Sequence, residues 1–146
     1  MSKSQACPCS PEQRYSHCCE PFHQAKAVPE TAEQLMRSRY SAYALAGTQP
    51  NLVYYLAQTH DPKTFRQGDA EIKAMQAWAE VVHFTHLVVR ETFAGMAHDR
   101  VGKVTFEAHY ERLDDPALKG KPQVLAERSR FRRYRGKWVY VDGEIR

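Results

Sequence analysis

The chain has 146 residues, of which 42% are hydrophobic and 26% charged, so its composition excludes a chain disordered throughout and leaves room for one domain plus a short module. No apolar run approaches the ~20 residues of a membrane span, and the polar start, Met1 to Gln5, lacks a secretory signal, which predicts a cytoplasmic protein without membrane contact. The net charge of +4 is uneven, because residues 128–137 alone carry six basic side chains, and this excludes a uniformly basic nucleic-acid binder.

All four cysteines fall within the first 19 residues, as a Cys-x-Cys pair and, after eight residues, a Cys-Cys pair: Cys7, Cys9, Cys18 and Cys19. In a reducing compartment such clustering indicates a metal before disulfides, and four soft ligands are typical of a closed tetrahedral zinc site. A segment this short has almost no core of its own, so zinc would supply the free energy that orders it. Two disulfides, four idle thiols and a redox role are the alternatives, and His17 or His23 is an alternative fourth ligand.

Helical patterns follow the cysteines. Thr31 and Gln34 form a capping box, and apolar side chains then recur at helical spacing as far as Gly47, which predicts a helix of about four turns. A second, shorter helix is expected to end before Asp61-Pro62, and a third to begin with Asp69 as its cap.

The remainder of the chain has the pattern of β-strands. Runs rich in Val, Phe and Thr, or alternating between apolar and polar, predict strands over residues 81–92, 103–113, 124–134 and 137–141. Arg135-Gly136 is a tight turn between the last two. Helices first and an antiparallel meander afterwards argue for an α+β fold.

Two stretches around the cysteines, Cys7-Pro8-Cys9-Ser10 and Tyr15-Ser16-His17-Cys18-Cys19, resemble the SEC-C motif. That motif is the small zinc finger at the C-terminus of the SecA translocation ATPase, and the resemblance implies that the four cysteines are zinc ligands. The loop over residues 10–14 lacks the glycines and lysines usual in the motif, which bears on partner contacts more than on the metal.

The chain as a whole resembles the bacterial YchJ family, in the runs at residues 29–43, 127–131 and 138–143. The resemblance implies a finger over residues 1–27, followed by a nuclear-transport-factor-2-like, or cystatin-like, cone over residues 28–146. In such a cone, helices pack on a curved antiparallel sheet. The resemblance implies no established activity.

Arg39 stands on the apolar stripe of the first long helix, so its charge must be paired or line a cavity. Glu127, on the more apolar face of the third strand, is its expected partner. The hypothesis is a polar pocket in the cone lined by Arg39, Tyr40, Tyr43, Glu127 and Trp138; the alternatives are a structural ion pair or an arginine that reaches the edge of the core.

The third strand also presents Arg128, Arg130 and Arg132 on one face. This stripe suits contact with phosphates or an acidic partner, while a solvated face or protection of a sheet edge are the plainer interpretations. No arrangement of histidines and carboxylates forms a recognisable catalytic motif.

These observations predict a non-enzymatic, zinc-binding adaptor whose finger docks a protein or ribonucleoprotein partner. The alternative is a small-molecule-binding or catalytic cone with the finger as an accessory. A homodimer formed through an exposed face of the sheet is a further alternative.

Overall fold

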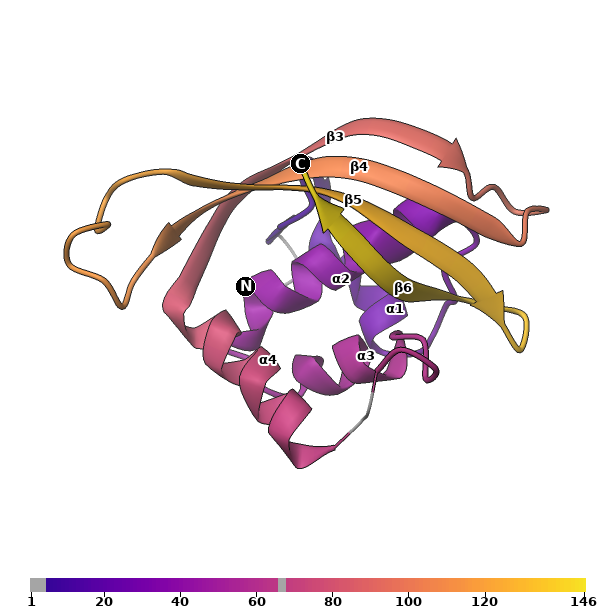
Figure 1. The fold of residues 1–146 in the computed structure, drawn as a ribbon, viewed down its shortest axis with the longest axis horizontal. Helices are drawn as coiled ribbons and strands as arrows, with labels where there is room; N and C mark the ends of the chain where they lie inside the picture. The colour runs from indigo at the N-terminus through magenta and orange to yellow at the C-terminus, as the bar shows by residue number, and fades with distance from the viewer. Residues whose placement is uncertain (1–4, 66–67) are drawn as a thin grey trace.

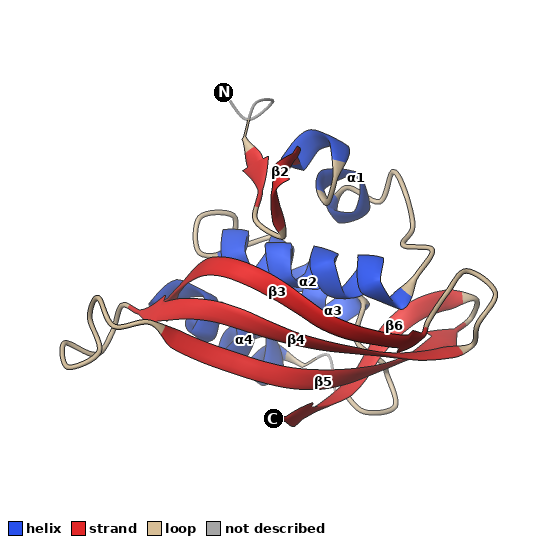
Figure 2. Cartoon of the chain, turned by 90° about the horizontal axis from the view of Figure 1, so that it is seen from above, coloured by secondary structure: helices blue, strands red, loops and turns tan. Residues whose placement is uncertain are grey.

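The helical periodicity after residue 31 forms α2 (Ala32–Ala46) in the computed structural model, which describes residues 5–65 and 68–146. Thr31 is the N-cap, and the backbone N–H of Gln34 donates to the Thr31 hydroxyl over 3.1 Å, as the capping box predicts. Gly47 is the C-cap, so both predicted ends are confirmed. Buried side chains occur all round α2, because the sheet covers one side and the finger another (Figure 2).

Two further helices complete the helical layer: α3 (Leu52–Gln58) and α4 (Asp69–Val81). The prediction that Asp69 caps α4 is wrong, because Gly68 occupies the N-cap and makes no side-chain hydrogen bond there. Asp69 is instead the first helical residue, where the partial positive charge of the helix end still favours a carboxylate. Among the described residues, no helix is long and apolar enough to cross a membrane.

Four antiparallel strands follow and form one curved sheet in chain order (Figure 1): β3 (Val82–Ala94), β4 (Val101–Arg112), β5 (Gln123–Tyr134) and β6 (Lys137–Ile145). The predicted alternation is confirmed on β4, where Val104 and Ala108 are buried in the core. Arg135 and Gly136 have φ values of 52° and 83°, as a two-residue hairpin turn requires. β6 continues beyond the predicted end at Val141, because residues 142–145 still pair with β5.

The finger packs beside α2, beyond the β3 edge of the sheet (Figure 2). Its described part consists of β1 (Ala6–Cys7), β2 (Ser10–Arg14), a 3-10 helix (Tyr15–His17) and α1 (Glu20–His23). Three of its cysteines and Tyr15 belong to the same buried cluster as side chains of α2, α3 and α4. The finger and the cone therefore share one hydrophobic core.

Candidate metal centre and cone pocket

Four sulfur atoms meet where the finger turns back on itself. Cys7 ends β1, Cys9 lies in the turn to β2, and Cys18 and Cys19 lie between the 3-10 helix and α1. Four Sγ–Sγ distances are 3.6 to 3.9 Å, and all four sulfurs lie within 4.8 Å of one another. Sulfurs at about 2.3 Å from a shared tetrahedral zinc ion are about 3.8 Å apart, whereas a disulfide joins its sulfurs at about 2.0 Å. The four free thiols therefore fit the ligand set of one zinc ion.

The helix α2 supplies the polar surroundings of this cluster. Arg37 Nη1 donates to the carbonyl oxygen of Cys9 over 3.1 Å, and Ser41 Oγ lies 3.5 Å from Cys7 Sγ. Burial and the neighbouring Cys9 sulfur raise the pKa of the Cys18 thiol to about 12. A bound cation would favour the thiolate form of such crowded thiols, so metal binding would release their protons to the solvent. Neither Arg37 nor Ser41 was predicted from the sequence to lie at this site, although their spacing of four residues places them on one side of the helix.

The two histidines offered as alternative ligands lie away from the sulfurs. His17 is exposed, and neither histidine belongs to the group of side chains that could share a metal ion among the described residues. His23 uses both ring nitrogens elsewhere: Nδ1 accepts from the Tyr15 hydroxyl over 2.6 Å, and Nε2 donates to the carbonyl oxygen of Ser38 over 2.8 Å. This tautomer follows from the carbonyl, which only accepts. The candidate metal site therefore consists of the four cysteines, without either histidine.

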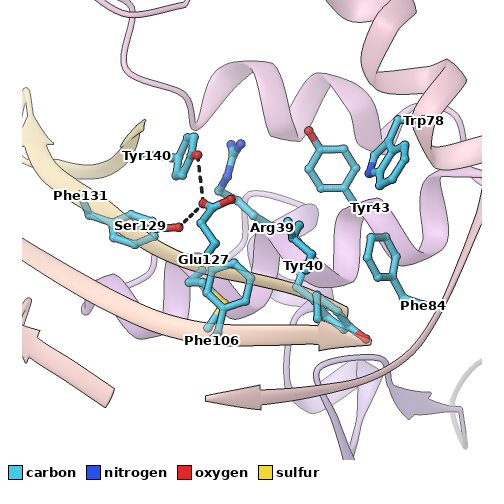
Figure 3. A pocket seen from close by; sticks show the side chains of 13 residues that line it. Arg39, Tyr40, Tyr43, Trp78, Phe84, Phe106, Glu127, Ser129, Phe131 and Tyr140 are labelled. Atoms are coloured by element: carbon cyan, nitrogen blue, oxygen red, sulfur yellow. Dashed lines mark hydrogen bonds between the residues drawn. The ribbon is translucent and has the colours of Figure 1, made fainter. Parts of the chain in front are cut away.

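A cavity of about 190 Å³ lies between the helices and the sheet, and we call it the cone pocket (Figure 3). Four of the five predicted residues line it: Arg39, Tyr40, Tyr43 and Glu127. Its other walls are mostly aromatic or aliphatic, and they come from α2, α4 and all four strands of the sheet: Met36, Trp78, Phe84, Phe106, Ala108, Leu125, Ser129, Phe131 and Tyr140. The cavity thus has an apolar body and one polar end.

Arg39 dominates the polar end. The residue is only 7% exposed, and its Nη1 donates to the Leu56 carbonyl oxygen and to Thr59 Oγ1, both over 2.7 Å. Its guanidinium carbon lies 4.8 Å from the ring centroid of Tyr140, in cation–π contact. Among the described residues, neither Nε nor Nη2 has a hydrogen-bond partner. Burial lowers the pKa of this guanidinium, because the charged group loses its water.

Glu127 lies at the same end of the pocket, but the predicted ion pair with Arg39 is wrong. Glu127 Oε2 accepts from Ser129 Oγ over 2.5 Å and from the Tyr140 hydroxyl over 3.1 Å (Figure 3). The carboxylate is therefore held by the sheet, while the guanidinium is held by the end of α3. Gly143 makes room for Glu127, since a Cβ at that position would collide with the carboxylate.

Trp138 does not line the cone pocket, which corrects the prediction. It is 3% exposed and packs with Leu35 and Met36, and its Nε1 donates to the carbonyl oxygen of Glu30 over 2.9 Å. The guanidinium carbon of Arg133 lies 4.2 Å from its ring centroid. The strand pattern could not show that the neighbouring Tyr140 and the distant Trp78 supply the aromatic walls instead.

Two of the three arginines of the stripe on β5 are ion-paired within the chain, which leaves less free charge for the predicted contact with phosphates or an acidic partner. Arg130 forms a two-pronged ion pair with Asp142 at 2.6 and 2.5 Å, and Arg132 forms one with Asp61 at 2.5 and 2.7 Å. Both carboxylates come from segments that sequence reasoning did not connect to the stripe. Arg128 is the remaining member, and its Nε is buried without a partner among the described residues.

Residues 31–143 match the family model described as "YchJ, middle NTF2-like domain". The chain belongs to the YchJ family. Curated relatives agree with this assignment: a UPF0225 protein of Streptomyces coelicolor is 37% identical over 95% of this chain and 94% of its own length. A UPF0225 protein of Ralstonia nicotianae is 38% identical over 96% of this chain and 91% of its own length.

Solved structures support the same fold for this YchJ-family chain. A SEC-C motif containing protein from Rhodopseudomonas palustris has a TM-score of 0.75 and 31% identity, covering 96% of this chain and 98% of that chain. A SEC-C motif containing protein from Psychrobacter arcticus has a TM-score of 0.74 and 26% identity, covering 100% and 86%. Both likenesses extend over the finger as well as the cone, because they cover nearly the whole chain.

Proposed function

We propose that the finger binds one structural zinc ion through Cys7, Cys9, Cys18 and Cys19. The four thiols supply a complete tetrahedral set, and three of the four cysteines are at most 3% exposed. A closed site of this kind leaves no position for a substrate or an activated water. Within the reducing cytoplasm that we propose for the protein, the thiols stay available to the metal. The zinc would hold the finger against α2 and so complete the shared core.

We further infer that the cone binds a small molecule in the cone pocket. The observation that carries this proposal is Arg39, a buried guanidinium at the end of an otherwise aromatic cavity, two of whose nitrogens have no hydrogen-bond partner among the described residues. Polar groups without protein partners inside a cavity are expensive for folding alone and are typical of binding sites.

Binding fits the site better than proton-transfer chemistry. A general acid or base works best with a pKa near the working pH. Burial raises the pKa values of the pocket tyrosines Tyr40, Tyr43 and Tyr140, so their hydroxyls stay protonated near neutral pH. Glu127 is already bound by two donors from the sheet. The proposed role of the pocket is therefore recognition.

Docking of a protein or ribonucleoprotein partner through the finger stays a prediction. Because the cysteines are buried, strand β2 is the part of the finger that would contact such a partner. Residues Pro11 to Arg14 are exposed, and β2 pairs only with β1 among the described strands. An open strand edge is one of the surfaces to which partners add.

A fragment screen followed by two-dimensional NMR of the zinc-loaded full chain tests the pocket. We expect single-ring fragments that carry a polar group to shift the amide signals of β5 and β6 around Glu127 and Tyr140. The Arg39→Met chain should remain folded to within about 1 kcal/mol of wild type, because two lost hydrogen bonds are offset by removal of an unpaired buried charge. It should lose the fragments that carry a carboxylate.

Arg130→Met is the matched control, because Arg130 is exposed and ion-paired outside the cone pocket. It should leave all fragment shifts unchanged. Fragments that bind only outside the pocket, or carboxylate fragments that bind Arg39→Met as well as wild type, would overturn the proposed binding function.

A further inference from the structure

We propose that the ligand of the cone pocket is a small zwitterion with an apolar body, of the class of the apolar α-amino acids. Its carboxylate would bind Arg39 and its ammonium group Glu127. The proposal rests on the proposed binding function and adds the chemical class of the ligand.

The polar end of the pocket offers one donor group and one acceptor group that do not satisfy each other. Arg39 keeps Nε and Nη2 without partners among the described residues, and Glu127 keeps Oε1 in the same condition, since both of its hydrogen bonds go to Oε2. The two side chains line one cavity and both contact Tyr140, yet no ion pair forms between them. A ligand placed between them can pair with both.

The opposite charges of Arg39 and Glu127 select against ligands that carry only one charged group. A simple carboxylate would gain Arg39 but face the Glu127 carboxylate, and a simple amine would gain Glu127 but face the guanidinium. In a half-buried site, like charges brought close together are unfavourable, and a group left unpaired loses its water without compensation. A zwitterion satisfies both side chains and adds no net charge to the cavity.

The rest of the pocket matches an apolar side chain of modest size. Tyr43, Trp78 and Phe84 form walls away from the polar end, and they are drawn beyond Arg39 in Figure 3. An engineered apolar cavity of about 150 Å³ holds benzene, so a cavity of about 190 Å³ accommodates a ring or a branched aliphatic group with a short polar head.

The backbone is shaped around the acidic member of the pair. Glu127 lies across Gly143 of the neighbouring strand, where any side chain would displace the carboxylate. Ser129 and Tyr140 then fix one oxygen and leave the other toward the cavity. Glu127 is therefore positioned by three residues of β5 and β6, which is more than a solvated surface carboxylate requires.

Isothermal titration of the zinc-loaded full chain with three matched probes tests the proposal. The probes are L-phenylalanine, 3-phenylpropionate, which lacks the ammonium group, and phenethylamine, which lacks the carboxylate. We expect L-phenylalanine to bind at least about tenfold more tightly than either analogue, the usual effect of one charged hydrogen bond. Equal or tighter binding of an analogue would overturn the zwitterion class while leaving a binding pocket in place.

The Glu127→Gln chain separates the role of the carboxylate from a structural role. The amide oxygen can still accept from Ser129 and Tyr140, so the fold should survive. L-phenylalanine should bind about tenfold more weakly, and 3-phenylpropionate should bind more tightly because repulsion is removed. Glu144→Gln, at an exposed position of the neighbouring strand β6, is the matched control and should change neither affinity.

A second variant tests the same contact in case the Glu127→Gln chain does not fold. Gly143→Ala adds one methyl group that displaces the Glu127 carboxylate, and it should weaken L-phenylalanine binding in the same direction. If the two variants weaken L-phenylalanine and 3-phenylpropionate equally, the ammonium contact is wrong. If fragments occupy the pocket but none of the three probes binds, the proposed ligand class is wrong and the proposed binding function stands. If nothing occupies the pocket, both the ligand class and the proposed binding function are wrong.

Discussion

The Cys18→Ser chain is expected to lose its zinc and, with it, the ordered finger. Elemental analysis should give about one zinc per chain for wild type and less than a tenth of that for the variant. The free energy of unfolding should fall by about 3 kcal/mol or more, because structural zinc supplies a large part of the folding free energy of small modules. Cys18 is the least buried of the four cysteines, so the serine itself disturbs little packing.

Amide hydrogen exchange should show where the stability is lost. Protection is expected to disappear in the finger first and then to weaken in α2, because Arg37, Ser38 and Ser41 of α2 contact the finger directly. His17→Ala is the matched control, since His17 is exposed beside the cluster and should leave both the zinc content and the exchange pattern unchanged. A metal-free wild-type chain that unfolds like the zinc-loaded one would contradict a structural metal.

Asp61→Asn is expected to lower the free energy of unfolding by about 2 kcal/mol at pH 7. Asp61 is 2% exposed, and both of its oxygens accept from Arg132. Its backbone N–H donates to the Tyr140 carbonyl oxygen over 2.8 Å, so the loop after α3 is fastened to β5 and β6 beside the cone pocket. The asparagine would leave Arg132 without a negatively charged partner and with one acceptor in place of two.

The effect of Asp61 should depend on pH in a defined direction. Hydrogen bonding to Arg132 lowers the pKa of the Asp61 carboxyl from 3.8 to about 2. A depressed folded-state pKa means that the carboxylate stabilises the fold above about pH 4, and that this stabilisation is lost as the pH falls through about 2. Urea denaturation of both chains from pH 7 downward should show their stability difference shrinking over that range.

Asp142→Asn is the matched control for this experiment. Asp142 forms the same two-pronged pair with Arg130, but the two side chains are 48% and 59% exposed. Exposed pairs contribute little, so this variant should stay close to wild type at every pH. Equal losses from the two variants would mean that burial does not set the strength of the Asp61 pair.

Local patterns predicted most of the secondary structure. The N-cap at Thr31 and the turn at Arg135-Gly136 depend on contacts within a few residues, and the structure confirms both. The other half of the capping box differs, because Gln34 Oε1 accepts from the Glu30 N–H and not from the Thr31 N–H. The prediction for Asp69 was wrong for a local reason as well, because Gly68 occupies the N-cap position expected for the aspartate. β6 ran on past its predicted end because its length depends on pairing with β5, which no local pattern contains.

In the cone pocket, the sequence predicted the buried arginine but not its contacts. Arg39 was identified because a charge on an apolar helix stripe needs an explanation, and that rule needs only helical periodicity. Its partners, Leu56 and Thr59, lie 17 and 20 residues away and could not be chosen from spacing. Trp138 and Tyr140 share one strand, and only the packing of α2 against the sheet decided which of them reached the cavity.

The sequence by itself determined the clustering of the four cysteines, the order of helices and strands, and the presence of a charge inside the cone. Those features follow from residue type and from the spacing of near neighbours, both of which can be read directly from the sequence. The tertiary structure alone decided that Arg39 and Glu127 stay apart, that Asp61 and Asp142 neutralise the arginine stripe, and that the finger joins the core of the cone. Those outcomes depend on which distant groups compete for the same donor or the same buried space, and that competition is settled only when the chain is folded.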